Sequence, residues 1–163
     1  MRALLLLSLI ACADPPADSG TPDGDTAGAA PGEGTLALSF RIDTDYQANM
    51  EEPAIGTFYG SYWLADEVSG IGPDEGAMDL GSIEVAVDLT AANPTAALLV
   101  SPPLPATEIV ILGFLDSDGN STADARRPDA KDPVTLPSDN DFDVVGGEET
   151  TAEVFFGLLN PTS

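Results

Sequence analysis

The 163-residue sequence contains no histidine, a single cysteine and only five basic residues. Without histidine there is no Ser-His or Cys-His nucleophile pair, no His-ligated zinc and no imidazole proton shuttle. One cysteine cannot form an intrachain disulfide, so a folded domain must be stable on apolar burial alone. The 28 acidic residues give a net charge of −23. Such a charge repels phosphate backbones, and we therefore expect no nucleic-acid partner.

The first residues have the features of an export leader. Met1-Arg2 is a short positive start, and residues 3–11 form an apolar run. This run is too short for a bilayer span, which needs about 20 residues. It ends in Leu9-Ile10-Ala11-Cys12, which resembles the lipobox of bacterial lipoproteins. The resemblance implies that residues 1–11 are a signal peptide and that Cys12 carries fatty acyl chains such as palmitate, which anchor it in a membrane. The alternative is an ordinary secretory signal with a chance cysteine.

The segment after the cysteine is acidic and small. Nine of residues 13–34 are Pro or Gly, five are acidic, and none is a large apolar residue. Burial cannot offset the entropy cost of ordering such a segment, so residues 12–34 are predicted to be a lipidated cysteine and a disordered, flexible linker. In the enterobacterial sorting pattern, Asp directly after the cysteine retains a lipoprotein at the inner membrane. Ala13 occupies that position and favours the outer membrane.

Strand signals begin at residue 35. Residues 35–42 and 82–89 alternate apolar and polar side chains, the pattern of strands with one buried face. Residues 55–65 are bulky on both faces, and Gly60 within them indicates a bulge or close backbone approach. Residues 107–115 are almost wholly apolar, as in a central strand covered on both faces. Three further segments complete the predicted set: residues 96–100, 141–145 and 150–159, the last two joined as a hairpin at Gly146-Gly147.

These seven short strands, without a helical pattern longer than a turn or two, predict an all-β fold. We expect residues 35–160 to form a seven-stranded antiparallel Greek-key β-sandwich, Ig-like or prealbumin-like. The stretch LGFLDSDGN…DPV…FDVVGGEETTAEVFF, within residues 112–156, resembles bacterial prealbumin-like or carboxypeptidase-regulatory-like sandwich domains. The resemblance implies an accessory or binding module rather than a catalyst.

Oxygen ligands follow the central strand at the spacing of a calcium loop. Positions 1, 3, 5, 7 and 9 of such a loop are occupied by Asp116, Asp118, Asn120, Thr122 and Asp124. The stretch DSDGN is similar to the calcium loops of thrombospondin-type and dockerin-like repeats. It departs from the EF-hand pattern at position 12, where Arg127 replaces a bidentate Glu, although Asp129 or Asp132 could fold back to complete the shell.

We therefore expect residues 116–132 to bind Ca²⁺ weakly, with a Kd on the order of 10⁻⁴–10⁻³ M. The alternative is a solvated acidic turn. In that case the carboxylates are neutralised by Arg126, Arg127 and Lys131, which are three of the few basic residues in the sequence.

Together these patterns predict a monomeric lipoprotein anchored to the bacterial cell envelope, a non-catalytic binding or structural module with an unidentified protein or glycan partner. An alternative is a carbohydrate-binding module that uses Tyr59, Tyr62 and Trp63 as an aromatic platform. A carboxylate-based hydrolase is the third hypothesis, although 28 acidic residues bring some carboxylates together by chance.

Overall fold

The computed structural model describes residues 32–50, 52–70, 72–90, 99–123 and 125–161. The predicted signal peptide, Cys12 and the linker up to residue 31 lie outside the described residues, as does Asp124. The elements are β1 (Glu33–Ile42), α1 (Thr44–Gln47), β2 (Ile55–Leu64), η1 (Ala65–Glu67), β3 (Val68–Ser69), β4 (Gly72–Pro73), β5 (Gly81–Asp88), β6 (Leu99–Val100), β7 (Leu104–Pro105), β8 (Glu108–Asp116), β9 (Pro133–Thr135), η2 (Pro137–Asp139), β10 (Asp141–Asp143) and β11 (Glu149–Leu159). A search of these described residues found no helix that is long and apolar enough to span a membrane.

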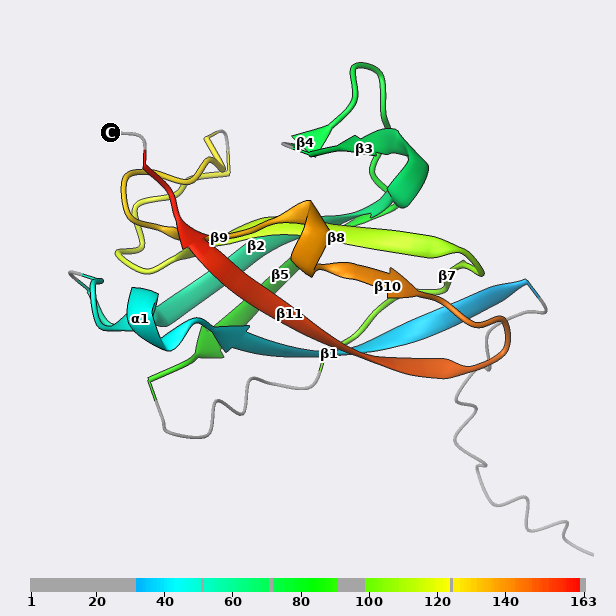
Figure 1. Cartoon of the computed structure of the whole chain (residues 1–163), viewed down its shortest axis with the longest axis horizontal. Helices are drawn as coiled ribbons and strands as arrows, with labels where there is room; N and C mark the ends of the chain where they lie inside the picture. The colour runs from blue at the N-terminus through cyan, green and yellow to red at the C-terminus, as the bar shows by residue number, and fades with distance from the viewer. Residues whose placement is uncertain (1–31, 51, 71, 91–98, 124, 162–163) are drawn as a thin grey trace, which may run out of the picture.

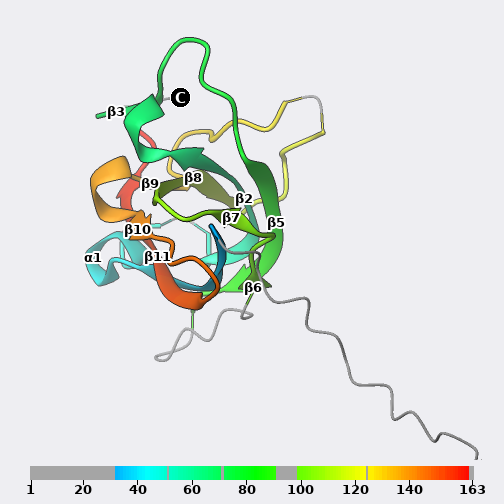
Figure 2. The ribbon, with the colours of Figure 1, turned by 90° about the vertical axis from the view of Figure 1, so that its right-hand side faces the viewer.

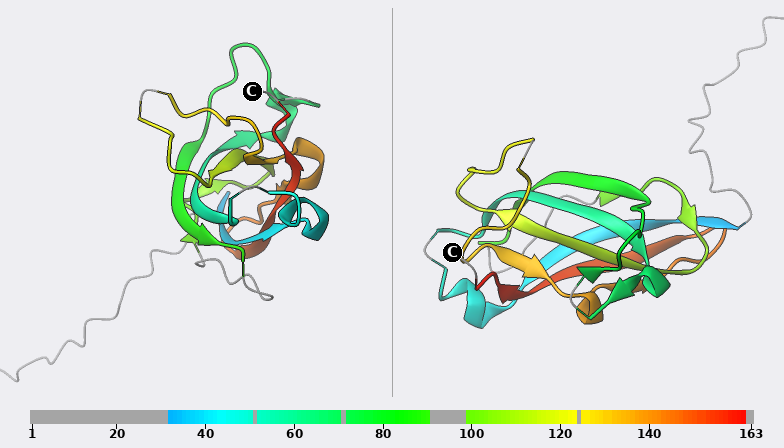
Figure 3. Two further views of the ribbon diagram at one scale, coloured as in Figure 1. Left: turned by 90° about the vertical axis from the view of Figure 1, so that its left-hand side faces the viewer. Right: turned by 90° about the horizontal axis from the view of Figure 1, so that it is seen from above.

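The predicted all-β class is confirmed. Most of the described strands belong to one sheet with the order β5-β2-β8-β9-β11-β1-β6, in which β10 also pairs with β8, and β7 with β1. The sheet curls around its own core (Figures 2 and 3). One wall consists of β5, β2 and β8, and the opposite wall contains β11 and β1 (Figure 1).

The sheet is mixed, and in this respect the prediction of a wholly antiparallel Greek-key sandwich is wrong. Strands β1 and β11 run parallel, in register from Thr35 beside Glu149 to Ile42 beside Phe156. Alternation reveals which face of a strand is buried but not the direction of its neighbour, so the pattern could not report this pairing.

The predicted hairpin at Gly146-Gly147 is also wrong. Strand β10 pairs with β8, whereas β11 lies between β9 and β1. The backbone N–H of Gly147 donates to the carbonyl of Glu33, so this turn contacts the start of β1, and the strands that it connects, β10 and β11, do not pair with each other. Gly147 has a φ of 77°, a conformation that glycine adopts without strain.

The core is built from the inward faces that the alternation predicted. Buried side chains come from every second position of the long strands, as in the series Leu36, Leu38, Phe40 and Ile42 of β1. The central strand β8 is buried on both faces, since Ile111 and Phe114 are 0% and 5% exposed. Its predicted position in the middle of the sheet is therefore confirmed.

Three phenylalanine rings and two glycines fill the centre of the core. The ring of Phe58 lies 5.1 Å from that of Phe40 and 5.5 Å from that of Phe156. Gly60 of β2 pairs with Gly113 of β8. A Cβ on either glycine would lie 2.6 Å from the Phe58 ring. The register through Gly60 is unbroken, so the predicted bulge is absent there; the space above this glycine pair is occupied by the Phe58 ring.

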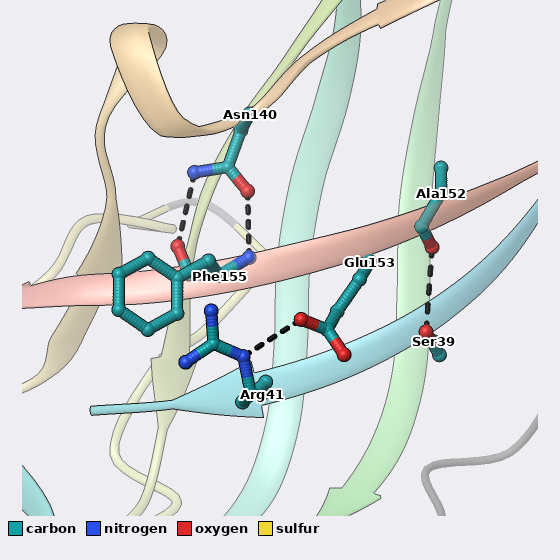
Figure 4. Close-up of polar contacts among 6 residues, drawn as sticks. All are labelled: Ser39, Arg41, Asn140, Ala152, Glu153 and Phe155. Carbon is teal, nitrogen blue, oxygen red and sulfur yellow. Dashed lines mark hydrogen bonds and ion pairs between the residues drawn. The ribbon is translucent and has the colours of Figure 1, made fainter. Parts of the chain in front are cut away.

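A buried asparagine joins η2 to the middle of β11. Asn140 is fully buried, and its Oδ1 accepts from the backbone N–H of Phe155 at 2.7 Å. Its Nδ2 donates to the carbonyls of Phe155, at 2.9 Å, and Leu136, at 3.0 Å. Figure 4 shows the two contacts with Phe155. The side chain thus bonds the backbone of β11 directly before the segment, beginning at Phe156, that pairs with β9.

Candidate functional site

The first predicted metal ligand lies where β8 ends. Asp116 is 3% exposed. Its Oδ1 accepts from the backbone N–H groups of Gly119, at 2.9 Å, and Asn120, at 3.2 Å, while its Oδ2 accepts from Ser121 at 3.2 Å. Three donors to one carboxylate close the chain into a tight turn, so Asp116 organises the loop that follows. We call residues 116–132 the Asp116 loop.

Two further predicted ligands meet a carboxylate from the far end of the loop. Asn120 donates through its backbone N–H to Asp118 Oδ1 at 3.1 Å and through Nδ2 to Asp118 Oδ2 at 2.7 Å. The same Nδ2 also donates to Oδ2 of Asp129. The structure therefore brings Asp116, Asp118 and Asn120 into one turn, and Asp129 folds back onto it.

The fourth predicted ligand is arranged differently. Thr122 is exposed, and its carbonyl accepts from the N–H of Ala125 at 3.0 Å in an isolated β-bridge. The fifth, Asp124, lies outside the described residues. In the described part of the loop, the side-chain oxygens that lie near one another thus come from residues 116–120 and from the segment that begins at Asp129.

Asp132 contributes a buried carboxyl group to the same region. It is 5% exposed, and its Oδ2 accepts from the backbone N–H of Asp129 at 3.0 Å. The pKa of Asp132 is raised to about 6, chiefly by burial; the negative charges of Asp129 and Asp116 act in the same direction, and the hydrogen bond from the backbone N–H of Asp129 opposes them. No group of three or more acidic side chains within the described ranges surrounds a common metal position.

A small pocket opens beside these carboxylates. It has a volume of about 160 Å³ and is lined by Met50, Glu52, Ser117, Asp118 and residues 129–132. The hydroxyl oxygens of Ser117 and Ser121 are buried and have no hydrogen-bond partner in the described part of the chain. A buried hydroxyl group without a hydrogen bond lowers the stability of the fold, so the loop contains two polar groups that its own donors and acceptors leave unsatisfied.

Arg126 points away from the carboxylates of the Asp116 loop. Its guanidinium forms an ion pair with Glu84 of β5 at 2.7 Å and lies 4.7 Å from the ring centroid of Tyr59. The alternative in which Arg126 neutralises the loop is therefore wrong. Lys131 lines the small pocket, and its backbone N–H donates to the carbonyl of Asn160 at 2.8 Å.

A larger groove crosses the outer face of the sheet next to this loop. Its floor includes the outward-facing side chains of β2 and β8, and its walls are the β3–β4 hairpin and parts of residues 126–137. Figure 1 shows both walls rising from the same side of the sheet. The groove has a volume of about 990 Å³, and Trp63, Leu112 and Phe114 are among its apolar lining residues. We call it the outer groove.

The outer groove differs in charge from the rest of the molecule. No Asp or Glu is among its described lining residues, although the whole chain has 28 of them. The one charged side chain in this lining is Arg126. Because the lining is apolar and nearly uncharged, its water is displaced more readily than water on the acidic surface elsewhere.

The predicted aromatic platform is divided between the two faces of β2. Tyr62 is 1% exposed and points into the core, where burial raises its pKa to about 12. Tyr62 is therefore excluded from any surface platform. Tyr59 and Trp63 point to the other face and line the outer groove, where the rings of Tyr59 and Phe114 lie 5.8 Å apart.

Sequence reasoning did not identify the groove itself. The signal was present, because residues 107–115 are apolar at outward as well as inward positions and Tyr59 and Trp63 share the outward face. The sequence places Arg126 in the loop rather than in the groove.

Comparisons with protein-family models, curated proteins and solved structures found no match to this chain. The resemblance to prealbumin-like domains therefore stays a prediction.

Proposed function

We propose that this chain is a membrane-anchored lipoprotein of the bacterial envelope, more specifically of the outer membrane, that serves as a non-catalytic binding or structural module. The observation that carries the binding role is the outer groove, an apolar surface with no acidic residue among its described lining, on a chain with a net charge of −23. A concave apolar site with few polar groups is the common form of a ligand-binding site. The lack of histidine supports a role without histidine-based acid–base catalysis.

The anchor is tested apart from the groove. Metabolic labelling with a fatty acid should mark the full chain in a bacterial host, and Cys12→Ala should abolish the label. Separation of inner and outer membranes should then find the labelled protein in the outer membrane. An unlabelled protein that is fully released by high salt would contradict the anchor without bearing on the groove.

A weak calcium site in the Asp116 loop belongs to the same proposal. It is supported by the turn around Asp116, by the return of Asp129 to Asn120, and by the unpartnered hydroxyls of Ser117 and Ser121. The amide nitrogen of Asn120 lies between two carboxylates in this structure. A bound cation would take over that role, and the amide would turn its oxygen inward.

Calcium should therefore stabilise the folded chain by a measurable amount. At about 5 mM Ca²⁺ and a Kd of about 0.5 mM, linkage gives about 1.4 kcal/mol. This corresponds to a rise of roughly 5 °C in the thermal midpoint for a domain of this size. Asp118→Ala should lose the rise, whereas the exposed Asp66→Ala, remote in sequence from the loop, should keep it. An unchanged midpoint in the parent chain would contradict the site.

Carbohydrate binding is a second candidate function. The observation that favours it is that Trp63 and Tyr59 share the lining of the outer groove, where a sugar ring could lie against them. Trp63 is the only tryptophan in the chain, so its fluorescence reports directly on this face. A panel of envelope glycans that leaves the emission of Trp63 unchanged would contradict this candidate.

A further inference from the structure

Two arginines in the chain have the same surroundings. Arg41 lies 4.1 Å from the ring centroid of Phe155 and pairs with Glu153 at 2.7 Å, as Figure 4 shows for the ion pair. Arg126 lies 4.7 Å from the centroid of Tyr59 and pairs with Glu84 at 2.7 Å. Both ion pairs are exposed to solvent, where such pairs are weak and exchange readily. The difference is location, since Arg126 lines the outer groove and Arg41 does not.

The charge of the groove restricts its occupant. A cationic ligand finds carboxylates over most of this molecule, but none among the described residues that line the groove. An anionic ligand is repelled by the net charge of −23, yet at this position no acidic residue is among the described lining residues, and the ligand can compete with Glu84 for the exposed guanidinium of Arg126. A single negative charge is therefore accommodated at one point of the groove.

The remaining lining determines the body of the ligand. Leu112 and Trp63, which are half-buried, present apolar surface along the floor beside the almost fully buried Phe114, and Pro73 and Pro128 extend it to the two walls. Arg126 and Phe114 already contact the ring of Tyr59, which leaves less of this ring for stacking with a sugar. A flexible hydrocarbon chain needs no hydrogen bonds from such a surface and gains from its burial.

We propose that the outer groove binds a single-chain amphiphile with a carboxylate head, that is, a fatty acid. The head replaces Glu84 as the partner of Arg126, and the hydrocarbon chain lies over Leu112, Phe114 and Trp63. The volume of about 990 Å³ is near the upper end of the range for small-molecule sites. This inference rests on the proposed binding-module function and names the ligand of that module.

The test uses the full chain with Cys12→Ala, which cannot be acylated at residue 12. Emission of Trp63 is titrated with decanoate, decanol and decyltrimethylammonium below their micelle concentrations, so that only the head group differs. Decanoate should bind most tightly and the cation most weakly. Arg126→Gln should weaken decanoate about tenfold, equivalent to about 1.4 kcal/mol, and leave decanol unchanged. Arg41→Gln, the matched control, should change neither.

A second variant covers the floor of the groove. Leu112→Glu places a carboxylate there and should abolish binding of decanoate and decanol alike, while far-UV circular dichroism verifies that the variant is folded. Equal affinities for the three head groups, or a decanoate affinity that Arg126→Gln leaves unchanged, would overturn the inference.

The result also separates this inference from the broader function. If decanoate leaves the emission of Trp63 unchanged but a glycan, an apolar peptide or phospholipid vesicles shift it, the fatty-acid proposal fails and the proposed binding module stands. If none of these ligands shifts the emission, both the inference and the binding role of the groove fail.

Discussion

Replacing Asn140 with alanine should destabilise the fold more than most single substitutions. Its side chain is fully buried and makes three hydrogen bonds, at 2.7, 2.9 and 3.0 Å, to the backbone of Phe155 and Leu136. Alanine leaves one buried N–H and two carbonyls without this partner. At about 1 kcal/mol for each bond, the expected loss is about 3 kcal/mol, a large part of the stability of an ordinary domain.

Urea unfolding followed by Trp63 fluorescence measures this loss through a lower midpoint at an unchanged slope. Ser39→Ala is the control, because Ser39 Oγ donates to the Ala152 carbonyl across 3.5 Å, the limit of a hydrogen bond. Its cost should stay within about 0.5 kcal/mol. If Asn140→Ala loses less than about 1 kcal/mol, or no more than Ser39→Ala, the asparagine does not hold η2 and β11 together.

Three further predictions concern the loop and the core. The folded-state pKa of Asp132, about 6, is above its usual value of 3.8, so its stabilising contribution is complete below about pH 4 and is lost as the pH rises through 6. Asp132→Asn should therefore unfold at a higher temperature than the parent at about pH 7.5 and at a similar temperature at about pH 4.5, and a constant difference between them would contradict the raised pKa. If the Asp116 loop binds Ca²⁺ as proposed, the metal requires ionised carboxylates, so calorimetry should find about tenfold weaker calcium binding at about pH 5 than at about pH 7.5, and a pH-independent affinity would exclude Asp132 from the site. Gly113→Ala should lower the free energy of unfolding in urea by about 2 kcal/mol, because its Cβ would lie 2.3 Å from the Tyr59 carbonyl oxygen. Gly76→Ala is the control that separates backbone strain from this clash, because Gly76 has open space around its Cβ but a φ of 90°.

The inward faces of the strands were predictable from the sequence because burial leaves a period of two. Leu36, Leu38, Phe40 and Ile42 were assigned to the core by alternation alone, and all four are buried. The class of the fold follows from such faces. The pairing of strands does not follow from these faces, since β1 and β11 are more than a hundred residues apart and either direction of β11 would bury Val154 and Phe156 equally well.

The candidate sites show the same division. Asp116, Asp118 and Asn120 are close in sequence, so their meeting in one turn was predictable from spacing. Burial of Asp132 was not, because it depends on how a distant part of the chain covers it. The apolar floor of the groove was visible in the sequence of β2 and β8, but its walls were not, since they come from separate loops, and Arg126 belongs to the groove only through the position of Glu84 on β5.

The parallel pairing of β1 and β11 also has a mechanical consequence. The chain enters β1 at Glu33, at the opposite end of the molecule from the Asp116 loop (Figures 1 and 3). If the preceding segment is anchored as proposed, tension from the membrane acts along the axis of β1. The register from Thr35 to Ile42 then bears this load along its whole length, in shear, rather than opening one hydrogen bond at a time. Tension that would peel a hairpin apart from its end is here distributed over the whole β1–β11 pair.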